Sequence, residues 1–139
     1  MPAPVSFDYA IVRVVPRVER EELVNAGVIL FCLQRDYLAA RVDLGESLER
    51  AVRGLWPEAD VELLRQHLEA IPRIAAGDPD GGPVARLTLR ERFHWLVSPR
   101  STMIQVSAVH SGLCESPEKA LDDIFRRMVA RGAEAASGR

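Results

Sequence analysis

The pattern of hydrophobic and polar positions is densest between residues 7 and 43, where three runs of β-type residues follow one another. Alternation of apolar and polar residues indicates a strand, because successive side chains point to opposite faces of a sheet. In the first run Arg13 is the one charged side chain on its face, and Gly27 in the second run indicates a bulge or a close backbone approach. The runs FDYAIVRVV, LVNAGVILFCLQ and YLAARVD therefore predict three consecutive strands that pair antiparallel.

Helical spacing of apolar residues replaces this alternation after the third run. Asp43, with Glu46 three residues later, predicts a capping box at the start of a first helix. A second helix is expected from Asp60, and Pro72 is expected to disturb its end, because proline lacks the backbone N–H that helical bonding needs.

The second half of the chain predicts two more helices and one more strand. Thr88 and Glu91 form a capping box ahead of a short helix, and alternation between residues 102 and 110 predicts a half-exposed fourth strand. Ser116 is expected to cap the final helix and Gly132 to close it. The buried stripe of that helix is predicted to comprise Leu121, Ile124, Phe125, Met128 and Val129.

The element order βββ-ααα-β-α predicts the α+β class, with an antiparallel sheet of about four strands covered by helices on at least one face. A chain of 139 residues fits a single domain over residues 1–139. Residues 1–6 and 132–139 are expected to fray.

Composition narrows the classes of function. The formal net charge of −2 gives no electrostatic attraction to nucleic acid or to an anionic membrane, so both partners are disfavoured. No leader-like segment and no apolar run long enough for a bilayer is present, which predicts a cytoplasmic protein. Cys32 and Cys114 lie far apart without metal-ligand spacing, so free thiols are expected, with no metal and no cofactor.

A set of polar residues interrupts the apolar pattern and could form a binding face. If the strand parities match, the set would meet on one side of the sheet and hold a carboxylate or phosphate, because the planar fork of arginine binds oxyanions. The alternative is that Arg13 and Arg41 each pair with a structural acid such as Asp8 or Asp43, and register decides between the two. The set comprises Arg13, Arg41, Arg100, Ser101, Gln105, Ser107 and His110.

His110 is a weak candidate for a catalytic base, because it lies between a strand and a helix start. Ser101, Ser107 or Cys114 would then be the nucleophile. The alternative is a hydrogen-bonded corner. The chain has no nucleophile elbow, no zinc-protease motif and no paired carboxylates, which favours a binding protein over an enzyme.

Two separated blocks of the chain resemble an uncharacterised bacterial family, the domain of unknown function DUF3037. The first block is YAIVRVVP from Tyr9 with EELVNAGVILF from Glu21, and the second is RFHWLVSPRST from Arg92 with VHSGL from Val109. The family's pattern includes Arg13, Asn25, Arg100, Ser101, Gln105 and His110. Members are often encoded beside a HipA-like kinase, so the resemblance implies an accessory or regulatory partner and carries no established activity.

The leading expectation is therefore a small cytoplasmic binding or interaction module that pairs with a kinase-like neighbour or with a second copy of itself. The alternative is an enzyme or sensor that binds an anionic small molecule or nucleotide on an Arg/His-lined sheet face. Convergence of the polar residues on one concave surface would favour the alternative. The candidate ligand-binding residues are Arg13, Asn25, Arg41, Arg100, Ser101, Gln105, Ser107 and His110.

Overall fold

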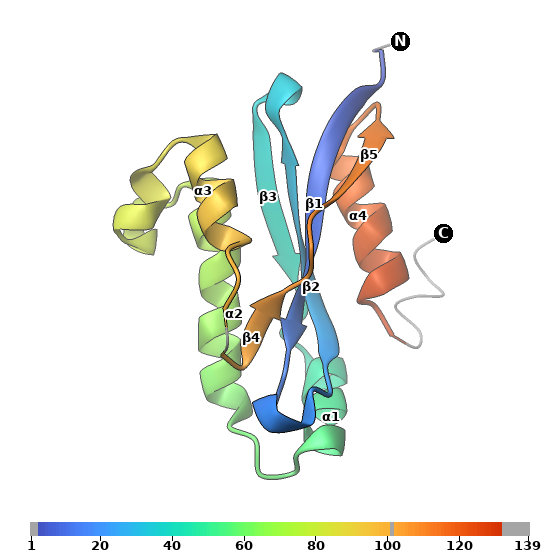
Figure 1. Ribbon diagram of the computed structural model, residues 1–139, viewed down its shortest axis with the longest axis vertical. Helices are drawn as coiled ribbons and strands as arrows, with labels where there is room; N and C mark the ends of the chain where they lie inside the picture. Colours follow the sequence, from blue (N-terminus) through green and yellow to red (C-terminus); the bar gives the residue numbers. More distant parts are fainter. Residues whose placement is uncertain (1–2, 101, 132–139) are drawn as a thin grey trace.

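The computed structural model describes residues 3–100 and 102–131, which form an antiparallel sheet of five strands with helices on both faces. The strands are β1 (Val5–Val14), β2 (Val24–Cys32), β3 (Tyr37–Val42), β4 (Ile104–Val106) and β5 (His110–Cys114). Their order is β3-β2-β1-β4, and β5 also pairs with β1, on the N-terminal part of that strand from Val5 to Tyr9 (Figure 1). The predicted α+β class with an antiparallel sheet is confirmed.

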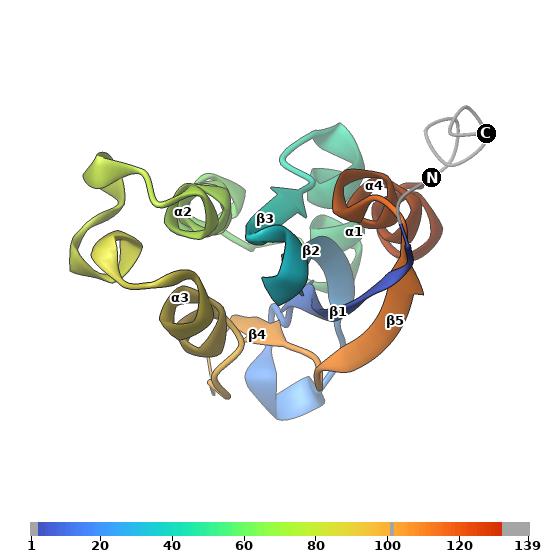
Figure 2. The same ribbon diagram turned by 90° about the horizontal axis from the view of Figure 1, so that it is seen from above.

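Four α-helices in the described part of the chain cover the sheet. They are α1 (Glu46–Leu55), α2 (Val61–Ala76), α3 (Leu89–Leu96) and α4 (Pro117–Met128). Figure 2 shows α2 and α3 on one side of the sheet and α4 on the other. Short 3-10 turns join the elements at Val18–Arg20, Leu33–Arg35, Pro79–Gly81 and Pro83–Arg86.

Strand alternation divides the core into two clusters. Val12 and Ile29 pack with buried residues of α1, α2 and α3, such as Leu68. Ile11 and Val28 face the other way and pack against α4. Because β1 and β2 have apolar residues on both faces, the sheet lies in the middle of three layers.

Gly27 lies opposite Val12, next to a register shift between Val12 and Arg13. A Cβ atom at Gly27 would lie 2.7 Å from Val42 Cγ1 and 2.8 Å from the carbonyl oxygen of Arg41. Both expectations for this glycine, a bulge and a close backbone approach, are confirmed. The absence of a side chain there lets β3 pair closely with β2.

The predicted fourth strand between residues 102 and 110 is two strands, β4 and β5, separated at Ser107. Ile11 N–H donates a hydrogen bond to Ser107 Oγ at 2.8 Å, and Ser107 N–H donates to the Ile11 carbonyl at 2.9 Å. The chain then leaves β1 and rejoins it at His110, opposite Tyr9. A side-chain oxygen therefore replaces one backbone acceptor of the ladder, and the strand is interrupted there.

The start of α1 differs from the prediction. Gly45 is the N-cap of α1, and no side chain caps this helix. Asp43 does not form a capping box with Glu46, because its Oδ1 accepts the Gly45 N–H at 2.9 Å and its Oδ2 accepts from Arg131 at 3.1 Å.

The end of α2 also differs, since the helix continues through Pro72 to Ala76. Burial of Ile74 and Ala75 holds this last turn in place despite the N–H that Pro72 lacks. Gly77, with φ of 71°, ends the helix.

The other predicted caps are present. Thr88 and Glu91 form the capping box, and the Ser116 side chain accepts the Lys119 N–H. The second helix begins next to Asp60, as predicted, and the Asp60 side chain caps it by accepting the Leu63 N–H. Met128, predicted to be buried, is 45% exposed, whereas Phe125 and Val129 on either side of it are buried and complete the sheet-facing stripe. The predicted closure at Gly132 and fraying of 132–139 lie outside the described residues, and β1 begins at Val5.

Candidate functional site

Three of the predicted site residues form one row across the sheet. Arg13 of β1 lies opposite Asn25 of β2 on one side and opposite Gln105 of β4 on the other. Directly opposed residues of antiparallel strands point to the same face. This face is the α4 side, because the Asn25 amide donates to the carbonyl of Met128, the last residue of α4, at 3.0 Å. The expected parity match between the first and fourth strands is therefore present for these residues.

Arg13 has an unusual environment within this row. Its Nε is buried and has no hydrogen-bond partner, and no ion pair within residues 3–100 and 102–131 includes it. The neighbouring amides are already engaged, since Gln105 Nε2 donates to the Thr102 carbonyl at 2.9 Å. Arg13 is thus the row's remaining donor.

Arg41 lies on the same face but serves the fold. Its Nη1 donates to Asp122 Oδ1 at 3.0 Å, and its guanidinium lies 4.2 Å from the centre of the Phe125 ring. Both contacts are with α4. Arg41 therefore pairs with a structural acid, as the alternative interpretation expects, although the acid is Asp122 instead of Asp8 or Asp43.

Arg100 lies away from this row, beside α3 and on the other side of the sheet. Its guanidinium donates to the carbonyl oxygens of Trp95 at 2.8 Å and Leu96 at 3.3 Å, and stacks 4.5 Å from the Trp95 ring centre. A cation at this place satisfies the carbonyls that a helix leaves open at its C-terminal end. Ser101, which follows it, lies outside the described residues.

His110 is exposed, and its ring centre lies 5.4 Å from that of Tyr9. No hydrogen bond among the described residues joins it to Ser107, whose hydroxyl donates to the Ala108 carbonyl at 2.9 Å. Cys114 is four residues further along β5, roughly 13 Å away at about 3.3 Å per residue. Burial raises the pKa of the Cys114 thiol, which disfavours the thiolate that a nucleophile needs.

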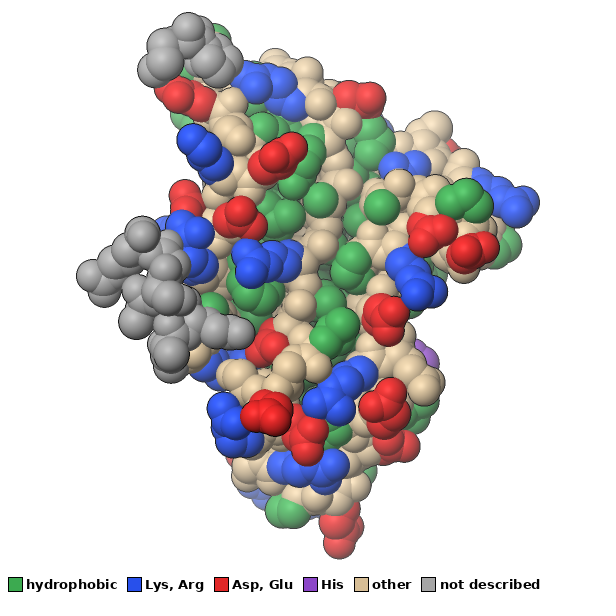
Figure 3. Space-filling model, turned by 180° about the vertical axis from the view of Figure 1, so that it is seen from behind, with side chains coloured by type: hydrophobic (Ala, Val, Ile, Leu, Met, Phe, Trp, Pro, Cys, Tyr) green, Lys and Arg blue, Asp and Glu red, His purple; other side chains and the backbone are tan. Residues whose placement is uncertain are grey.

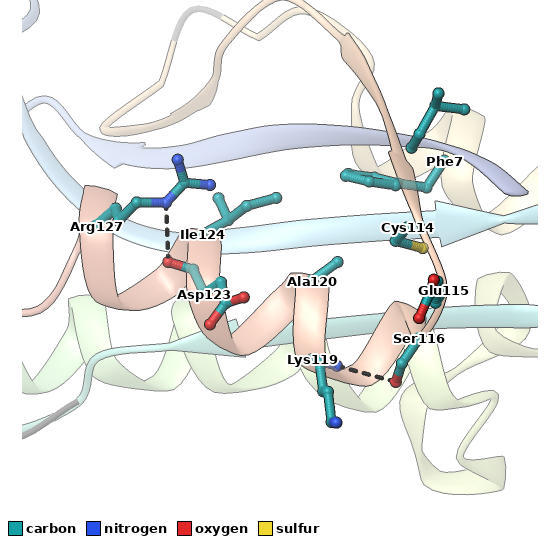
Figure 4. A pocket seen from close by; sticks show the side chains of 10 residues that line it. Phe7, Cys114, Glu115, Ser116, Lys119, Ala120, Asp123, Ile124 and Arg127 are labelled. Atoms are coloured by element: carbon teal, nitrogen blue, oxygen red, sulfur yellow. Dashed lines mark hydrogen bonds between the residues drawn. The ribbon is translucent and has the colours of Figure 1, made fainter. Parts of the chain in front are cut away.

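Four surface cavities are lined by described residues, and none of the four includes a residue of the predicted polar set. The largest, about 530 Å³, lies between β5 and α4 (Figure 4). Figure 4 shows Cys114 at one side of it, and Arg127 Nε donating to the Asp123 carbonyl, at 3.4 Å. The polar set therefore does not converge on a concave surface among these four.

The surface seen from behind the view of Figure 1 carries charges of both signs. Figure 3 shows Lys or Arg side chains interspersed with Asp or Glu along both borders of a hydrophobic band. A surface of this kind lacks the single-sign field that attracts polyanions. Within the described ranges, no three His, Cys, Asp or Glu side chains are grouped to hold a metal ion.

Within residues 3–100 and 102–131, the most exposed large apolar side chain is Leu113 of β5, at 74%. Val109, just before β5, is 45% exposed. In the described part of the chain β5 pairs only with β1, so its outer edge is open. Figure 2 shows β5 at the margin of the molecule, with no helix beyond it.

Sequence reasoning missed this edge because HSGLC contains Gly112, which weakens a strand pattern. Gly112 is required by packing, since a Cβ there would lie 2.7 Å from the Phe7 ring. The signal that could have found the strand is the alternation of His110, Gly112 and Cys114, which lie opposite the α4-facing residues of β1.

Comparison with known proteins gives one match. A model of a protein family described as a protein of unknown function, DUF3037, matches residues 9–129. No curated protein and no solved structure matches the chain. In the described residues, none of the helices is both long enough and apolar enough for a transmembrane span.

Proposed function

Since this chain belongs to the DUF3037 family, whose function is unknown, we propose its function from its own surface: it is a small interaction module that binds a protein partner along the outer edge of β5. The observation that carries the proposal is Leu113, a leucine 74% exposed on an unpaired strand edge. Fully burying such a side chain contributes about 1.5–3 kcal/mol.

The chemistry of β5 suits the addition of a strand. The unpaired backbone N–H and C=O groups of an edge strand can pair with another chain. Proteins that avoid such pairing place proline or charged residues, especially lysine, on the edge. The sequence HSGLC has none of these apart from His110. A partner strand would gain main-chain hydrogen bonds from the edge and apolar contact from Leu113.

The internal contacts of the polar set support binding of a protein over binding of a small anion. Arg41 pairs with Asp122, Arg100 with helix carbonyls, and Ser107 with Ile11. These donors already have partners within the fold. Arg13 is the exception, and the exposed apolar surface on the β5 edge likewise lacks a partner among the described residues.

The partner we propose is a HipA-like kinase encoded beside this chain, with the module as its accessory or regulatory subunit in the cytoplasm. The resemblance of the blocks at Tyr9 and Arg92 to DUF3037 supports this choice of partner.

The experiment is titration of the purified kinase with this protein by calorimetry, alongside two leucine variants. Leu113→Lys should weaken binding at least tenfold. The apolar contact of Leu113 would be lost, and the lysine charge would have to be desolvated at the centre of the interface. Leu23→Lys, at the other end of the sheet and 45% exposed, should bind as the unchanged protein does. Absence of a complex, or equal loss in both variants, would overturn the proposal. A dimer of this chain abolished by Leu113→Lys would replace the kinase with a second copy.

A second candidate function is the binding of an anionic small molecule or nucleotide at Arg13, with Asn25 and Gln105 beside it. The buried, unpartnered Nε of Arg13 favours it. Thermal unfolding with inorganic phosphate, citrate or ATP tests it, because a ligand at a hundred times its Kd stabilises the fold by about 2.7 kcal/mol. Arg13→Gln should abolish the stabilisation, whereas Arg17→Gln, whose arginine pairs with Glu19, should not.

A further inference from the structure

A second surface feature lies at the other end of the interrupted edge strand. A cavity of about 400 Å³ opens between the first half of α2, the loop after α1 and β4. Apolar side chains form most of its wall, and Leu63 among them is 47% exposed. The apolar lining comprises Trp56, Leu63, Leu64, Met103 and Ile104. Clefts of roughly 300–1,000 Å³ with such walls are the usual form of binding pockets.

The polar part of the lining comprises Glu58, Asp60, His67 and Thr102, so the carboxylates carry its formal charge. Glu58 and Asp60 both contribute, and no lysine or arginine does. Asp60 Oδ1 accepts the Leu63 N–H at 3.1 Å, and no ion pair between described residues neutralises either carboxylate. An indole ring with two carboxylates beside it attracts a cation by ring quadrupole and by charge.

We propose that this cavity is a side-chain pocket for an extended protein segment in which an aromatic or large aliphatic residue stands next to a lysine or arginine. The apolar residue would enter between Leu63 and Ile104, and the cation would lie over Trp56 and beside Glu58. The charge complementarity of the acidic lining selects this occupant over an acidic segment.

The pocket would add specificity to the proposed function. It rests on that function in one respect, which is that the bound segment follows the sheet edge formed by β5. Ile104 belongs both to the lining and to β4, which runs along β1 in line with β5. A segment bound along this edge would therefore meet the pocket. In such recognition, main-chain pairing provides affinity and side-chain pockets provide specificity.

The test uses two dipeptide probes with the full chain, N-acetyl-Phe-Arg-amide and N-acetyl-Phe-Glu-amide. Each is titrated to about 10 mM, where a site of millimolar Kd is saturated, while the indole N–H signals of Trp56 and Trp95 are followed by NMR. The arginine probe should shift the Trp56 signal and leave Trp95 unmoved, with an affinity at least fivefold above that of the glutamate probe. No shift at Trp56, or equal affinities, would overturn the proposal.

Two variants separate this proposal from the proposed function. Glu58→Gln, at an exposed position, should reduce the preference for the arginine probe by about threefold without loss of the fold. Leu113→Lys should leave dipeptide binding unchanged while weakening the kinase complex at least tenfold. If no kinase complex forms but the preference for the arginine probe remains, only the proposal for the β5 edge is refuted. If the complex forms but the preference is absent, only the proposal for the pocket is refuted.

Discussion

Ser107 and Ile11 exchange two hydrogen bonds: Ile11 N–H donates to Ser107 Oγ at 2.8 Å, and Ser107 N–H donates to the Ile11 carbonyl at 2.9 Å. Ser107 is 6% exposed, so its hydroxyl is a buried part of the sheet. The contact lies between β4 and β5, where the edge of the sheet would otherwise leave Ile11 N–H without an acceptor. Ser107, which the sequence predicts to be a ligand-binding residue, therefore stabilises the edge of the sheet between β4 and β5.

Replacement of Ser107 should destabilise the fold. Ser107→Ala leaves a buried N–H unpaired, which costs about 1–3 kcal/mol in the free energy of unfolding measured with urea. Ser111→Ala is the matched control, because its hydroxyl donates to Asp8 at the surface and its loss should cost under about 0.5 kcal/mol. Equal stability of the two variants would contradict a structural role for Ser107.

The contact of Arg41 with Asp122 should contribute little through charge. The two side chains are 48% and 53% exposed, so a double-mutant cycle of Arg41→Met and Asp122→Asn should give a coupling energy below about 1 kcal/mol. Arg41→Ala should cost more than Arg41→Met, since only alanine uncovers the Phe125 ring. A coupling of several kcal/mol would show that the pair is buried in solution.

Glu49 should make stability depend on pH. Hydrogen bonds from Arg65 and then Arg53 lower the pKa of Glu49 from its ordinary value of 4.5. The folded carboxylate therefore contributes stability that is present above pH 4.5 and is lost as the pH falls through the lowered pKa.

The measurement is the difference in unfolding free energy between the unchanged protein and Glu49→Gln, at about pH 7 and at about pH 3. The difference should be larger at the higher pH. Glu58→Gln, which removes a carboxylate without an ion pair to a described residue, is the control. A Glu49→Gln difference that does not vary with pH would refute the assignment.

Cys114 should react slowly with iodoacetamide at neutral pH. Burial raises the pKa of its thiol, so the reactive thiolate is scarcer than in a free cysteine. Its alkylation rate should still rise with pH where that of N-acetylcysteine has levelled off, and Cys114→Ser should remove native-state labelling because Cys32 is buried. Alkylation faster than that of N-acetylcysteine would indicate an activated nucleophile and restore a catalytic role for this strand.

Hydrophobic periodicity predicted most of the fold because the apolar residues that carry it also form the core. The first three strands and the order of the helices could be derived in this way, and the cap at Ser116 could be derived from its hydroxyl and position. The division of the fourth strand could not, because it depends on a contact between Ser107 and Ile11, which are 96 residues apart. The extension of α2 past Pro72 likewise depends on burial, which overrides local preference.

The candidate site was predictable only in part. Parity indicated that Arg13 and Gln105 would share a face if their strands paired, and they lie directly opposite each other. The partners of Arg41 and Arg100 could not be foreseen, because Asp122 and the α3 carbonyls approach them only through packing of helices on different faces. The open edge of β5 also follows from strand order, which no local pattern contains.

Hydrogen exchange of the backbone amides of β5 tests the central claim most directly. The exchange of residues 110–114 is measured by mass spectrometry with and without the HipA-like kinase, and β3, the edge strand at the opposite end of the sheet, is the internal reference. Strand addition predicts that exchange in β5 slows in the complex while that of β3 is unchanged, because an added strand supplies acceptors for the outward N–H groups. A complex that leaves β5 exchange unaltered, or protects β3 instead, would contradict the assignment of this edge as the binding surface.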